Sequence, residues 1–433
     1  MKTLLKKILM YDKLYPFLKE SFIYVAWKRL NGQLANLMYG HPSKDFFVIG
    51  VTGTNGKTTT VNLIHQIINA HVGKCVSVST ANILIGDQIV PNKKKMTSLD
   101  IYDLQSTLAM AKDSGCKIAV LETSSHGLSQ FRFEGVEFDF GILTNVTHDH
   151  LDYHGTMDSY IKAKKKLFEY ILASKKQHKY ATFPGDDKIG RQRFDEMPFD
   201  KKVSFSITGS SSLKAENIVE KTDGTDFVVS YLGKQYPVHA KLVWSFNVYN
   251  ILAALSVSVQ IGIDIEKSIA TIEKFEGVDG RMQHVNHNWV DCYVDFAHSP
   301  DALEKTLNYL NMIKWTGKLI TVFGAPGLRD TLKRPVMGDI VQNNSDIMIV
   351  TDDDPDTENR LSIIQQVTQN ITKKTLGKDF FILPERKLAI KFALESAVPG
   401  DIVMCAGKGH ETMQYTNLER RKWSDVEEIE GNL

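Results

Sequence analysis

The sequence predicts an α/β protein with two large domains, of which the first is built on a mostly parallel sheet. From residue 46 onward, short apolar runs typical of buried strands alternate with longer runs of helical periodicity. Residues 203–243 depart from this pattern and show alternating polar and apolar residues between glycines, which indicates a small antiparallel extension. A chain of 433 residues also exceeds the usual size of a single domain.

The first large domain is expected to span 46–278. Its strands are apolar runs of strand length, and its helices are longer segments in which apolar residues recur every three or four positions. The expected strands are 46–51, 74–80, 117–125 and 138–146, and the expected helices are 58–72, 99–115, 157–172 and 247–262. The runs 203–207, 226–232 and 235–242 are assigned to the antiparallel extension.

Two glycines and a change in charge near 275–281 indicate a linker. After it, the apolar runs 289–297, 318–325, 346–353 and 401–407 are expected to be strands between helices. We therefore predict a second, Rossmann-like α/β domain over 279–433.

Residues 1–45 are expected to form one or two short helices with more lysine and arginine than acidic residues. The favoured interpretation is a helical cap that packs on the next domain. The alternative is a basic amphipathic segment that makes peripheral contact with an anionic membrane.

Composition excludes several classes of protein. The net charge of +1 gives no indication of a nucleic-acid partner. Four scattered cysteines without a CxxC pair argue against a disulfide framework or a zinc site. No apolar run is long enough to span a bilayer, and lysines interrupt the N-terminus too often for a secretory signal. We expect a cytoplasmic protein.

The stretch "VIGVTGTNGKTTT" at 48–60 is a strand, a glycine-rich turn and the start of a helix. Such a turn points backbone N–H groups at a phosphate, and a lysine and a threonine hydroxyl can then serve the terminal phosphates and Mg²⁺. Gly53, Gly56, Lys57 and Thr58 supply these parts, although Val51 replaces the first glycine of the strict P-loop pattern. We predict ATP binding by a P-loop-type domain.

Two further stretches carry ionisable residues at expected strand ends. Glu122 ends a buried strand, where a carboxylate is costly unless it meets a cation such as Mg²⁺. The alternative is that Glu122 caps the following turn. "TNVTHDHLDYHG" at 144–155 carries three histidines but no cysteine, which disfavours zinc.

These motifs resemble the Mur ligase family, most closely its MurE type, the UDP-N-acetylmuramoyl-tripeptide synthetases. The resemblance rests on "GVTGTNGKTTT", "LETSSHGL", "TNVTHDHLDYHGTMDSYIKAKKKLF", "FNVYNILAA", "GRMQ", "DFAHSPDAL", "RDTLKRPVMG" and "GKGHE", which cover about residues 46–415. It implies an ATP-dependent ligase that activates a carboxylate as an acyl phosphate and couples it to an amino acid in peptidoglycan precursor synthesis. ATP would lie between the domains, so that domain closure gates the reaction.

The resemblance implies a role for each matching residue. Lys57, Glu122, His150, Lys164 and Arg281 are expected to be catalytic, with Thr58 and Glu122 on a first Mg²⁺ and His150 and Lys164 on a second. In the family the lysine that matches Lys164 is carbamylated, whereas the residues alone suggest only a solvated basic helix face. The nucleotide residues implied are Gly53, Thr54, Asn55, Gly56, Lys57, Thr58, Thr59, Asn145, Asn247, Asn250, Arg281, Asp295 and His298.

The resemblance also implies two substrate sites. The muramoyl-peptide positions are Thr97, Ser98, Ser124, Gln130, Arg132 and His154, although some of these could simply cap turns. The amino-acid positions are Arg329, Asp353, Asp354, Asp356, Gly407 and Glu411. The diaminopimelate-adding type carries Asp-Asn-Pro-Arg, whose arginine clamps a carboxylate; here Asp356 replaces that arginine and would repel one. We therefore expect a cationic substrate such as L-lysine, unless the acidic run is only a helix N-cap.

Only about 45 residues precede the nucleotide strand, so the usual N-terminal domain that grips UDP is expected to be missing. The acceptor could then bind through a weaker UDP contact or lack UDP altogether. The alternatives are a ligase of another γ-glutamyl chain, of the folylpolyglutamate or poly-γ-glutamate type, and a non-catalytic scaffold. The protein is expected to act as a monomer.

Overall fold

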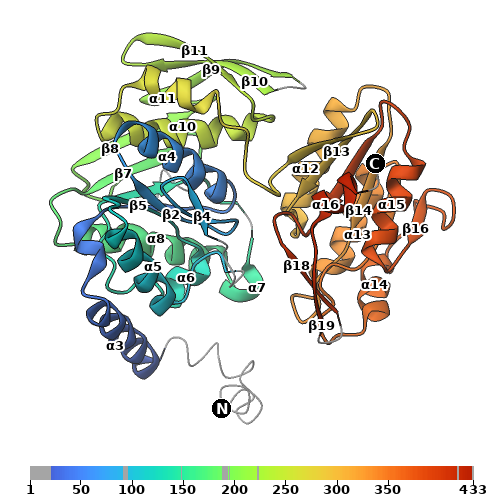
Figure 1. The fold of residues 1–433 in the computed structure, drawn as a ribbon, viewed down its shortest axis with the longest axis horizontal. Helices are drawn as coiled ribbons and strands as arrows, with labels where there is room; N and C mark the ends of the chain where they lie inside the picture. Colours follow the sequence, from blue (N-terminus) through green and yellow to red (C-terminus); the bar gives the residue numbers. More distant parts are fainter. Residues whose placement is uncertain are drawn as a thin grey trace. The chain divides into compact units, whose positions relative to one another are not determined.

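The computed structural model describes residues 21–90, 96–147, 149–187, 194, 196–221, 224–416 and 419–431. The chain divides between Phe275 and Glu276 into two compact units, which we call unit 1 and unit 2 (Figure 1). Each unit contains its own sheet, as the alternation of strand and helix patterns predicts.

Unit 1 is organised around one long sheet. Among the described residues, eleven strands run across it in the order β11-β10-β9-β8-β7-β6-β1-β5-β2-β3-β4. Parallel pairing extends from β9 to β2, and antiparallel hairpins complete both edges. The strands are β1 Phe47–Thr52, β2 Cys75–Val78, β3 Ile83–Ile85, β4 Gln88–Val90, β5 Ile118–Glu122, β6 Phe140–Leu143, β7 Tyr180–Pro184, β8 Lys201–Ser206, β9 Leu213–Lys221, β10 Gly224–Tyr231 and β11 Lys234–Ala240.

The predicted antiparallel extension is correct for the runs 226–232 and 235–242, which form most of β10 and β11. β9 was not predicted, and the antiparallel pairing expected for the run at 203–207 is wrong. That run lies in β8, which pairs in parallel with both β7 and β9. Burial along β8 rises from the exposed Lys201 and Lys202 to the buried Phe205 and Ser206, so its alternation of polar and apolar residues does not correspond to one exposed face. Alternation carries no information about strand direction, which depends on the path of the connecting segment.

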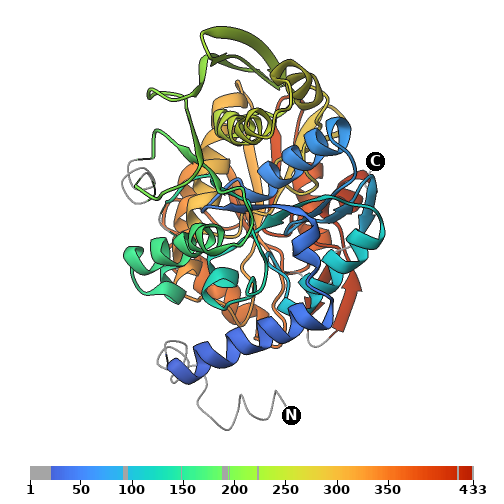
Figure 2. The same ribbon diagram turned by 90° about the vertical axis from the view of Figure 1, so that its left-hand side faces the viewer.

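Helices cover both faces of the unit 1 sheet. α4, α10 and α11 pack together on one face (Figures 1 and 2), while α5 and α8 contribute to a core on the other face with Val48, Leu121 and Phe138. Side-chain caps fix several starts, such as Ser124 on α6 and Thr156 on α8. The helices are α3 Phe22–Met38, η1 Pro42–Asp45, α4 Lys57–His71, α5 Ile101–Asp113, α6 Ser125–Ser129, α7 Leu151–His154, α8 Met157–Ala173, α10 Ser245–Gln260 and α11 Ile265–Ile272.

Unit 2 contains a sheet of six strands among its described residues, in the order β12-β13-β17-β14-β15-β16. All pairs are parallel except β12 with β13. The strands are β12 Gln283–His287, β13 Val290–Asp295, β14 Leu319–Phe323, β15 Ile347–Val350, β16 Phe380–Ile382, β17 Ile402–Ala406, and the separate hairpin β18 Met413–Thr416 with β19 Glu419–Lys422. The helices are α12 Pro300–Ile313, α13 Lys333–Asn344, α14 Arg360–Thr368, α15 Arg386–Ser396 and α16 Asp425–Glu430.

The expected N-terminal helix is confirmed in part by α3, since residues 1–20 lie outside the described residues. Phe22 and Ile23, at the start of α3, are both exposed. Among the helices described, none is long and apolar enough to cross a bilayer.

Candidate active site

The glycine-rich turn lies at the carboxyl end of β1, between that strand and α4. Gly56 is the N-cap of α4 and has a φ of 81°, in the left-handed region that favours glycine. A Cβ at Gly56 would lie 2.0 Å from the Asn250 Oδ1, and one at Gly53 would lie 1.8 Å from the Thr144 hydroxyl. The turn is therefore a cradle that only glycine fits, and its backbone N–H groups can approach a phosphate.

Two amines converge on one carbonyl of this turn. The Lys57 ammonium donates to the carbonyls of Gly53 and Thr54, at 3.2 and 2.8 Å. The Lys164 Nζ, which comes from α8, donates to the same Gly53 carbonyl at 2.6 Å. The structure thus brings the predicted phosphate lysine and the predicted carbamylation site to one atom.

Lys164 is buried, with a side chain that is 1% exposed. Burial, and secondly the charge of Lys57, lower its pKa well below the usual value for lysine. Its amine also lies over the ring of Tyr160, 4.2 Å from the centroid, and the Tyr160 hydroxyl contacts Thr54 Oγ1 at 3.1 Å. The interpretation of this position as part of a solvated basic face is therefore wrong.

Glu122 lies at the end of β5, beside β1, and is 2% exposed. The Thr58 hydroxyl lies 3.2 and 3.1 Å from its two carboxylate oxygens. The backbone N–H and hydroxyl of Thr80, which follows β2, donate at 2.7 and 3.0 Å. The turn-capping alternative for Glu122 is wrong, because Ser124 caps α6. Buried carboxylate and hydroxyl oxygens are the ligands that Mg²⁺ prefers.

The turn is also held from the side by β6 and α10. Asn145, just after β6, accepts from the Asn55 N–H at 3.0 Å and donates to the Asn55 carbonyl at 3.1 Å. On α10, Asn250 donates to Asn247 at 2.9 Å. Thr59 lies in the first turn of α4, half-buried. The nucleotide residues predicted in unit 1 therefore form one neighbourhood.

His150 lies at the start of α7, in the left-handed conformation with a φ of 53°. Its ring lies 6.3 Å from that of Tyr160 and 4.8 Å from that of His126. Burial, together with His150, His154 and two cationic residues, lowers the His126 pKa to about 3. His148, part of the same motif, lies outside the described residues.

Most of the residues predicted to bind the muramoyl peptide form one hydrogen-bonded group. Ser98 and Ser124 join through their hydroxyls at 2.8 Å, and Arg132 donates to the Ser98 carbonyl at 2.7 Å and to Gln130 at 2.6 Å. His154 is placed close by through Ser125, at 3.1 Å. Ser124 does cap α6, as the alternative interpretation foresaw. Thr97 is half-buried next to Ser98.

In unit 2, Arg281, Asp295 and His298 gather around Phe296. The Arg281 guanidinium lies 4.9 Å from the Phe296 centroid, and the His298 ring lies 4.4 Å from it. Asp295 is buried at the end of β13, where it accepts from the Met282 N–H at 2.7 Å. Burial raises its pKa, although the charge of Arg281 opposes the shift.

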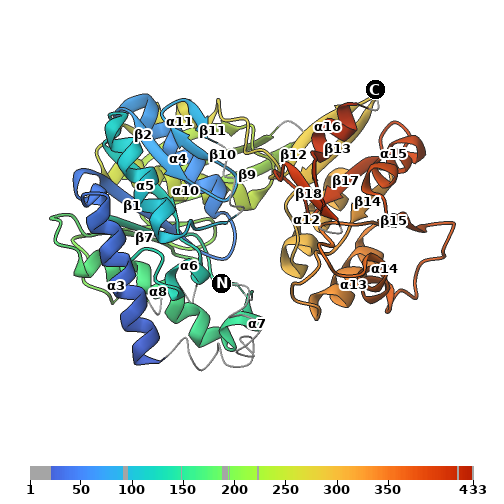
Figure 3. The same ribbon diagram turned by 60° about the horizontal axis from the view of Figure 1, so that its bottom comes forward.

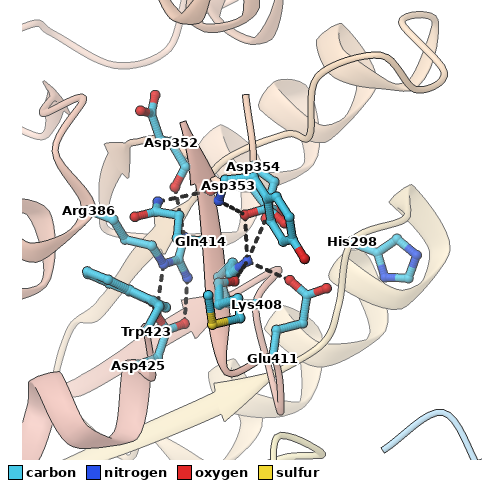
Figure 4. Close-up of polar contacts among 12 residues, drawn as sticks. His298, Asp352, Asp353, Asp354, Arg386, Lys408, Glu411, Gln414, Trp423 and Asp425 are labelled. Atoms are coloured by element: carbon cyan, nitrogen blue, oxygen red, sulfur yellow. Dashed lines mark hydrogen bonds and ion pairs between the residues drawn. The ribbon is translucent and has the colours of Figure 1, made fainter. Parts of the chain in front are cut away.

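A second group in unit 2 contains three carboxylates and one amine (Figure 4). Lys408, fully buried just after β17, donates to Asp354 at 2.7 Å and to Glu411 at 2.5 Å, and lies 3.9 Å from Asp353. The three acids offer oxygens within 4.8 Å of one another. Burial raises the Asp353 pKa to about 6, and the three carboxylates outweigh burial to raise the Lys408 pKa.

Other predicted amino-acid residues border this acidic group. Gly407 has a φ of 107°, and a Cβ there would lie 2.8 Å from Asp353 Oδ2. Asp356 lies outside the group of three acids, with its N–H donating to the Tyr415 carbonyl at 3.2 Å. Arg329 is exposed in the segment after β14. The interpretation of the acidic run as a helix N-cap is wrong, because Asn359 caps α14.

Sequence reasoning missed three residues that hold the site together. Thr80 binds Glu122, Tyr160 lies between Lys164 and Thr54, and Lys408 neutralises part of the acidic group. A signal existed for Thr80, since it follows a strand expected to end at the same sheet edge. Lys408 stood inside the quoted motif "GKGHE", but its burial depends on tertiary packing.

Comparisons with known proteins place the chain in a family. Residues 51–258 match the Mur ligase middle domain and residues 280–409 match the Mur ligase glutamate ligase domain. The chain is 37% identical over 413 residues to a UDP-N-acetylmuramoyl-L-alanyl-D-glutamate–2,6-diaminopimelate ligase of Geobacter sulfurreducens, covering 92% of this chain and 80% of the relative. It is 35% identical to a UDP-N-acetylmuramyl-tripeptide synthetase of a Roseiflexus species, covering 92% and 81%.

Solved structures agree with the sequence relatives. A structure of a UDP-N-acetylmuramoyl-L-alanyl-D-glutamate–2,6-diaminopimelate ligase aligns with a TM-score of 0.62 at 33% identity, covering 89% of this chain and 78% of that one. A folylpolyglutamate synthase of Mycobacterium tuberculosis aligns with a TM-score of 0.70 at 15% identity, covering 88% and 92%. At that identity the second likeness concerns the fold.

Proposed function

Starting from the fact that this chain belongs to the Mur ligase family, we propose a specific chemistry and substrate preference for it. Members of this family are ATP-dependent, ADP-forming ligases that add an amino acid to a muramoyl peptide in peptidoglycan precursor synthesis, and this chain is one of them. The proposals concern the acyl phosphate, the metal sites, the modified lysine and the identity of the amino acid.

The proposed reaction has two steps. A carboxylate oxygen of the acceptor attacks the γ-phosphorus of ATP, and the bond to the β-γ bridging oxygen breaks, which releases ADP and leaves an acyl phosphate. The amine of the amino acid, after losing a proton, attacks the acyl carbon; the carbon–oxygen bond to phosphate breaks and inorganic phosphate leaves. The cradle around Gly53 and Gly56 supports this proposal, with Lys57 placed for the terminal phosphates.

Mg²⁺ fits the oxygen groups beside this cradle. We propose that Thr58 and Glu122 hold one ion, because the Thr58 hydroxyl already points at a buried carboxylate. His150 and a modified Lys164 would hold a second. Bound there, Mg²⁺ would offset the negative charge of the phosphates as the acceptor carboxylate approaches.

The state of Lys164 supports carbamylation. A neutral amine attacks CO₂ at carbon, forms an N–C bond and releases one proton, which converts the neutral side chain into an anion. Burial and the neighbouring Lys57 both favour the neutral amine at Lys164. Lys162 lies two residues away and is exposed, so it lacks this environment. In a test of carbamylation by substitution, Lys162 is therefore the matched control for Lys164.

The amino acid that we propose is one with a cationic side chain, such as L-lysine. Asp353, Asp354 and Glu411 surround a single ammonium, so the group has more negative than positive charge. A second ammonium is attracted there, and a distal carboxylate is repelled. Arg329, exposed after β14, would serve the α-carboxylate. Relatives are named for diaminopimelate, so this preference distinguishes the chain from them.

The acceptor that we propose is a muramoyl dipeptide, recognised by the hydrogen-bonded group of Ser98, Ser124, Gln130 and Arg132. We propose that the protein acts in the cytoplasm as a monomer, with peripheral membrane contact through its N-terminal segment.

The test is a coupling assay with the purified full chain, ATP and Mg²⁺. Acceptors would be the muramoyl dipeptide with and without UDP, and a folyl glutamate as the competing acceptor; amino acids would be L-lysine, L-ornithine and meso-diaminopimelate. Products would be identified by mass spectrometry and ADP release measured in parallel. We expect lysine or ornithine to be coupled at least tenfold faster than diaminopimelate.

Preference for diaminopimelate would overturn the electrostatic argument while leaving the ligase chemistry in place. Coupling to the folyl glutamate but not to the muramoyl dipeptide would overturn the acceptor. Transfer of ¹⁸O from the acceptor carboxylate to inorganic phosphate is expected for an acyl phosphate, and its absence would contradict that intermediate.

A further inference from the structure

Helix α3 carries an apolar stripe that faces away from unit 1. The stripe consists of Ile23, Trp27, Leu30, Leu34 and Leu37, which are 80%, 54%, 55%, 49% and 63% exposed. Their spacing alternates between four and three residues, so all five lie along one face of the helix. Phe22 and Met38, at the two ends of the helix, are 86% and 73% exposed.

The opposite face of α3 holds the helix to unit 1. Gly32 and Ala35 are its buried residues. A Cβ at Gly32 would lie 2.5 Å from the Glu134 Cβ and 3.0 Å from the Ile101 Cδ1, so the helix backbone lies directly against unit 1. Figure 3 shows α3 along the outside of this unit, next to α5. The stripe therefore lies outward, and the packing of α3 does not account for it.

Scattered apolar residues are common on protein surfaces, but a continuous row of large ones indicates an interaction site. A helix of 17 residues is roughly 26 Å long, and the stripe runs along most of it. Removal of five such side chains from water is favourable, because the gain grows with the apolar surface buried. The described part of unit 1 leaves this surface largely uncovered.

The charges around the stripe indicate which surface covers it. Residues 21–38 contain Lys28 and Arg29 and no acidic residue. In the sequence, residues 1–38 carry seven basic and two acidic side chains, whereas the whole chain has a net charge of only +1. Lys28 lies beside the stripe, 5.3 Å from the Trp27 ring centroid. Among the described residues, Lys28 and Arg29 thus put positive charge on the same helix as the exposed apolar surface.

We infer that α3 docks in the plane of an anionic lipid bilayer, with the stripe in the interfacial region and the basic residues near the headgroups. An apolar face, basic flanks and an interfacial tryptophan are the features of helices that lie on membranes. Basic residues near an anionic surface are attracted to it, and salt weakens that attraction. A second copy of the chain is a poorer occupant, because it would bring two basic helices together with no acidic residue to offset them.

This inference concerns a surface and does not depend on the proposed reaction. The test is co-sedimentation of the full chain with vesicles of phosphatidylcholine alone and with an added third of phosphatidylglycerol. The variant Trp27→Gln/Leu30→Gln/Leu34→Gln disrupts the stripe. The control Ile89→Gln/Leu232→Gln removes two side chains that are even more exposed, at 70% and 82%, from other surfaces of unit 1.

We expect the wild type and the control to sediment with anionic vesicles and to dissociate from them as the salt concentration is raised. Neither should bind neutral vesicles. The stripe variant should bind at least tenfold more weakly with an unchanged melting temperature. Failure of wild type to bind anionic vesicles, equal binding to neutral ones, or full binding by the stripe variant would each overturn the inference. A dimer that the same substitutions dissociate, without vesicle binding, would assign the stripe to a second copy instead. Should the triple variant fail to fold, Leu34→Gln and quenching of Trp27 by nitroxide lipids in wild type decide in its place.

Discussion

The Thr58 hydroxyl lies within hydrogen-bond distance of both carboxylate oxygens of Glu122, a residue 64 positions later in the chain. The contact joins the first turn of α4 to the end of β5, and it assembles the oxygen groups of the proposed first magnesium site. We expect Glu122→Gln to keep the hydrogen bonding of this position but to lose its charge.

Loss of that charge should lower kcat about 10²- to 10³-fold, since electrostatic groups at the reacting phosphate have effects of this size. Steady-state ADP release across a range of Mg²⁺ concentrations checks the prediction. The melting temperature without nucleotide serves as the folding control. Wild-type activity in Glu122→Gln would remove Glu122 from the metal site.

Gly56→Ala should destabilise the protein more than Gly115→Ala does. The two glycines have similar φ values, 81° and 85°, so both substitutions carry a similar strain of about 1–2 kcal/mol. Only at Gly56 would the new Cβ also clash, 2.0 Å from Asn250 Oδ1, whereas nothing lies within 4 Å at Gly115. Urea unfolding of both variants measures the difference, and ATP binding should be lost only in Gly56→Ala. Equal losses of stability would show that the cradle relaxes freely.

Asp425→Asn should lower the stability of unit 2 by about 3–5 kcal/mol, because it leaves the buried Arg386 guanidinium without its counter-ion. Arg386 and Asp425 are both fully buried and paired at 2.6 Å. The control Glu427→Gln breaks an exposed pair with Lys422 and should change stability little. Calorimetry of both variants measures the two losses of stability. Losses of similar size would contradict the prediction that breaking the buried ion pair costs much more than breaking the exposed one.

The stability of unit 2 should fall as pH rises from about 4 to about 6, through the titration of Asp353. Burial raises the pKa of this group from 3.8 to about 6 in the folded protein, so the folded state binds more protons than the unfolded state in that window. The stability contributed by protonated Asp353 is complete below the pKa that the group has in the unfolded chain. It is lost as the pH rises through the pKa that the group has in the folded protein. Asp353→Asn should remove a change of about 2–3 kcal/mol from the pH profile. If the difference in stability between Asp353→Asn and wild type did not change with pH across this range, Asp353 would not be the titrating group.

Glu411→Gln should raise the KM for the amino acid about 10- to 100-fold, because loss of a hydrogen bond to a charged group has an effect of about this size. The KM for the muramoyl acceptor should change much less, because its proposed residues are in unit 1. Glu395→Gln, which alters an exposed acid 3.7 Å from Lys391, is the control. Equal changes in both KM values would point to a general loss of structure.

Much of the chemistry was predictable from the sequence because it is local. The segment from Phe47 to His71 specifies strand, turn and helix through its own periodicity and glycines, and the structure forms them in place. The buried position of Glu122 was predictable for a related reason, because it ends the apolar run that forms β5. The position of Lys164 in its motif was suggested by resemblance, since nothing local distinguishes it from the exposed Lys162.

What the sequence could not provide depends on contacts between distant segments. The direction of β8 follows from the path of the chain before it, and the burial of Lys408 among three carboxylates depends on how β15 and β17 are placed in the sheet. The exposure of the α3 stripe also depends on distant contacts. The sequence places apolar Ile23 on one face of the helix and small Gly32 on another, and only tertiary packing decides that the Gly32 face is the buried one.

The sequence by itself determined the α/β class, the glycine-rich turn after β1 and the acids available to the candidate site, because backbone periodicity, glycine geometry and charge are properties of short segments. Tertiary structure alone decided which amine is buried, which acids share one cation and which helix face remains open. Those outcomes depend on desolvation and on distances between residues far apart in the chain, which no short segment contains.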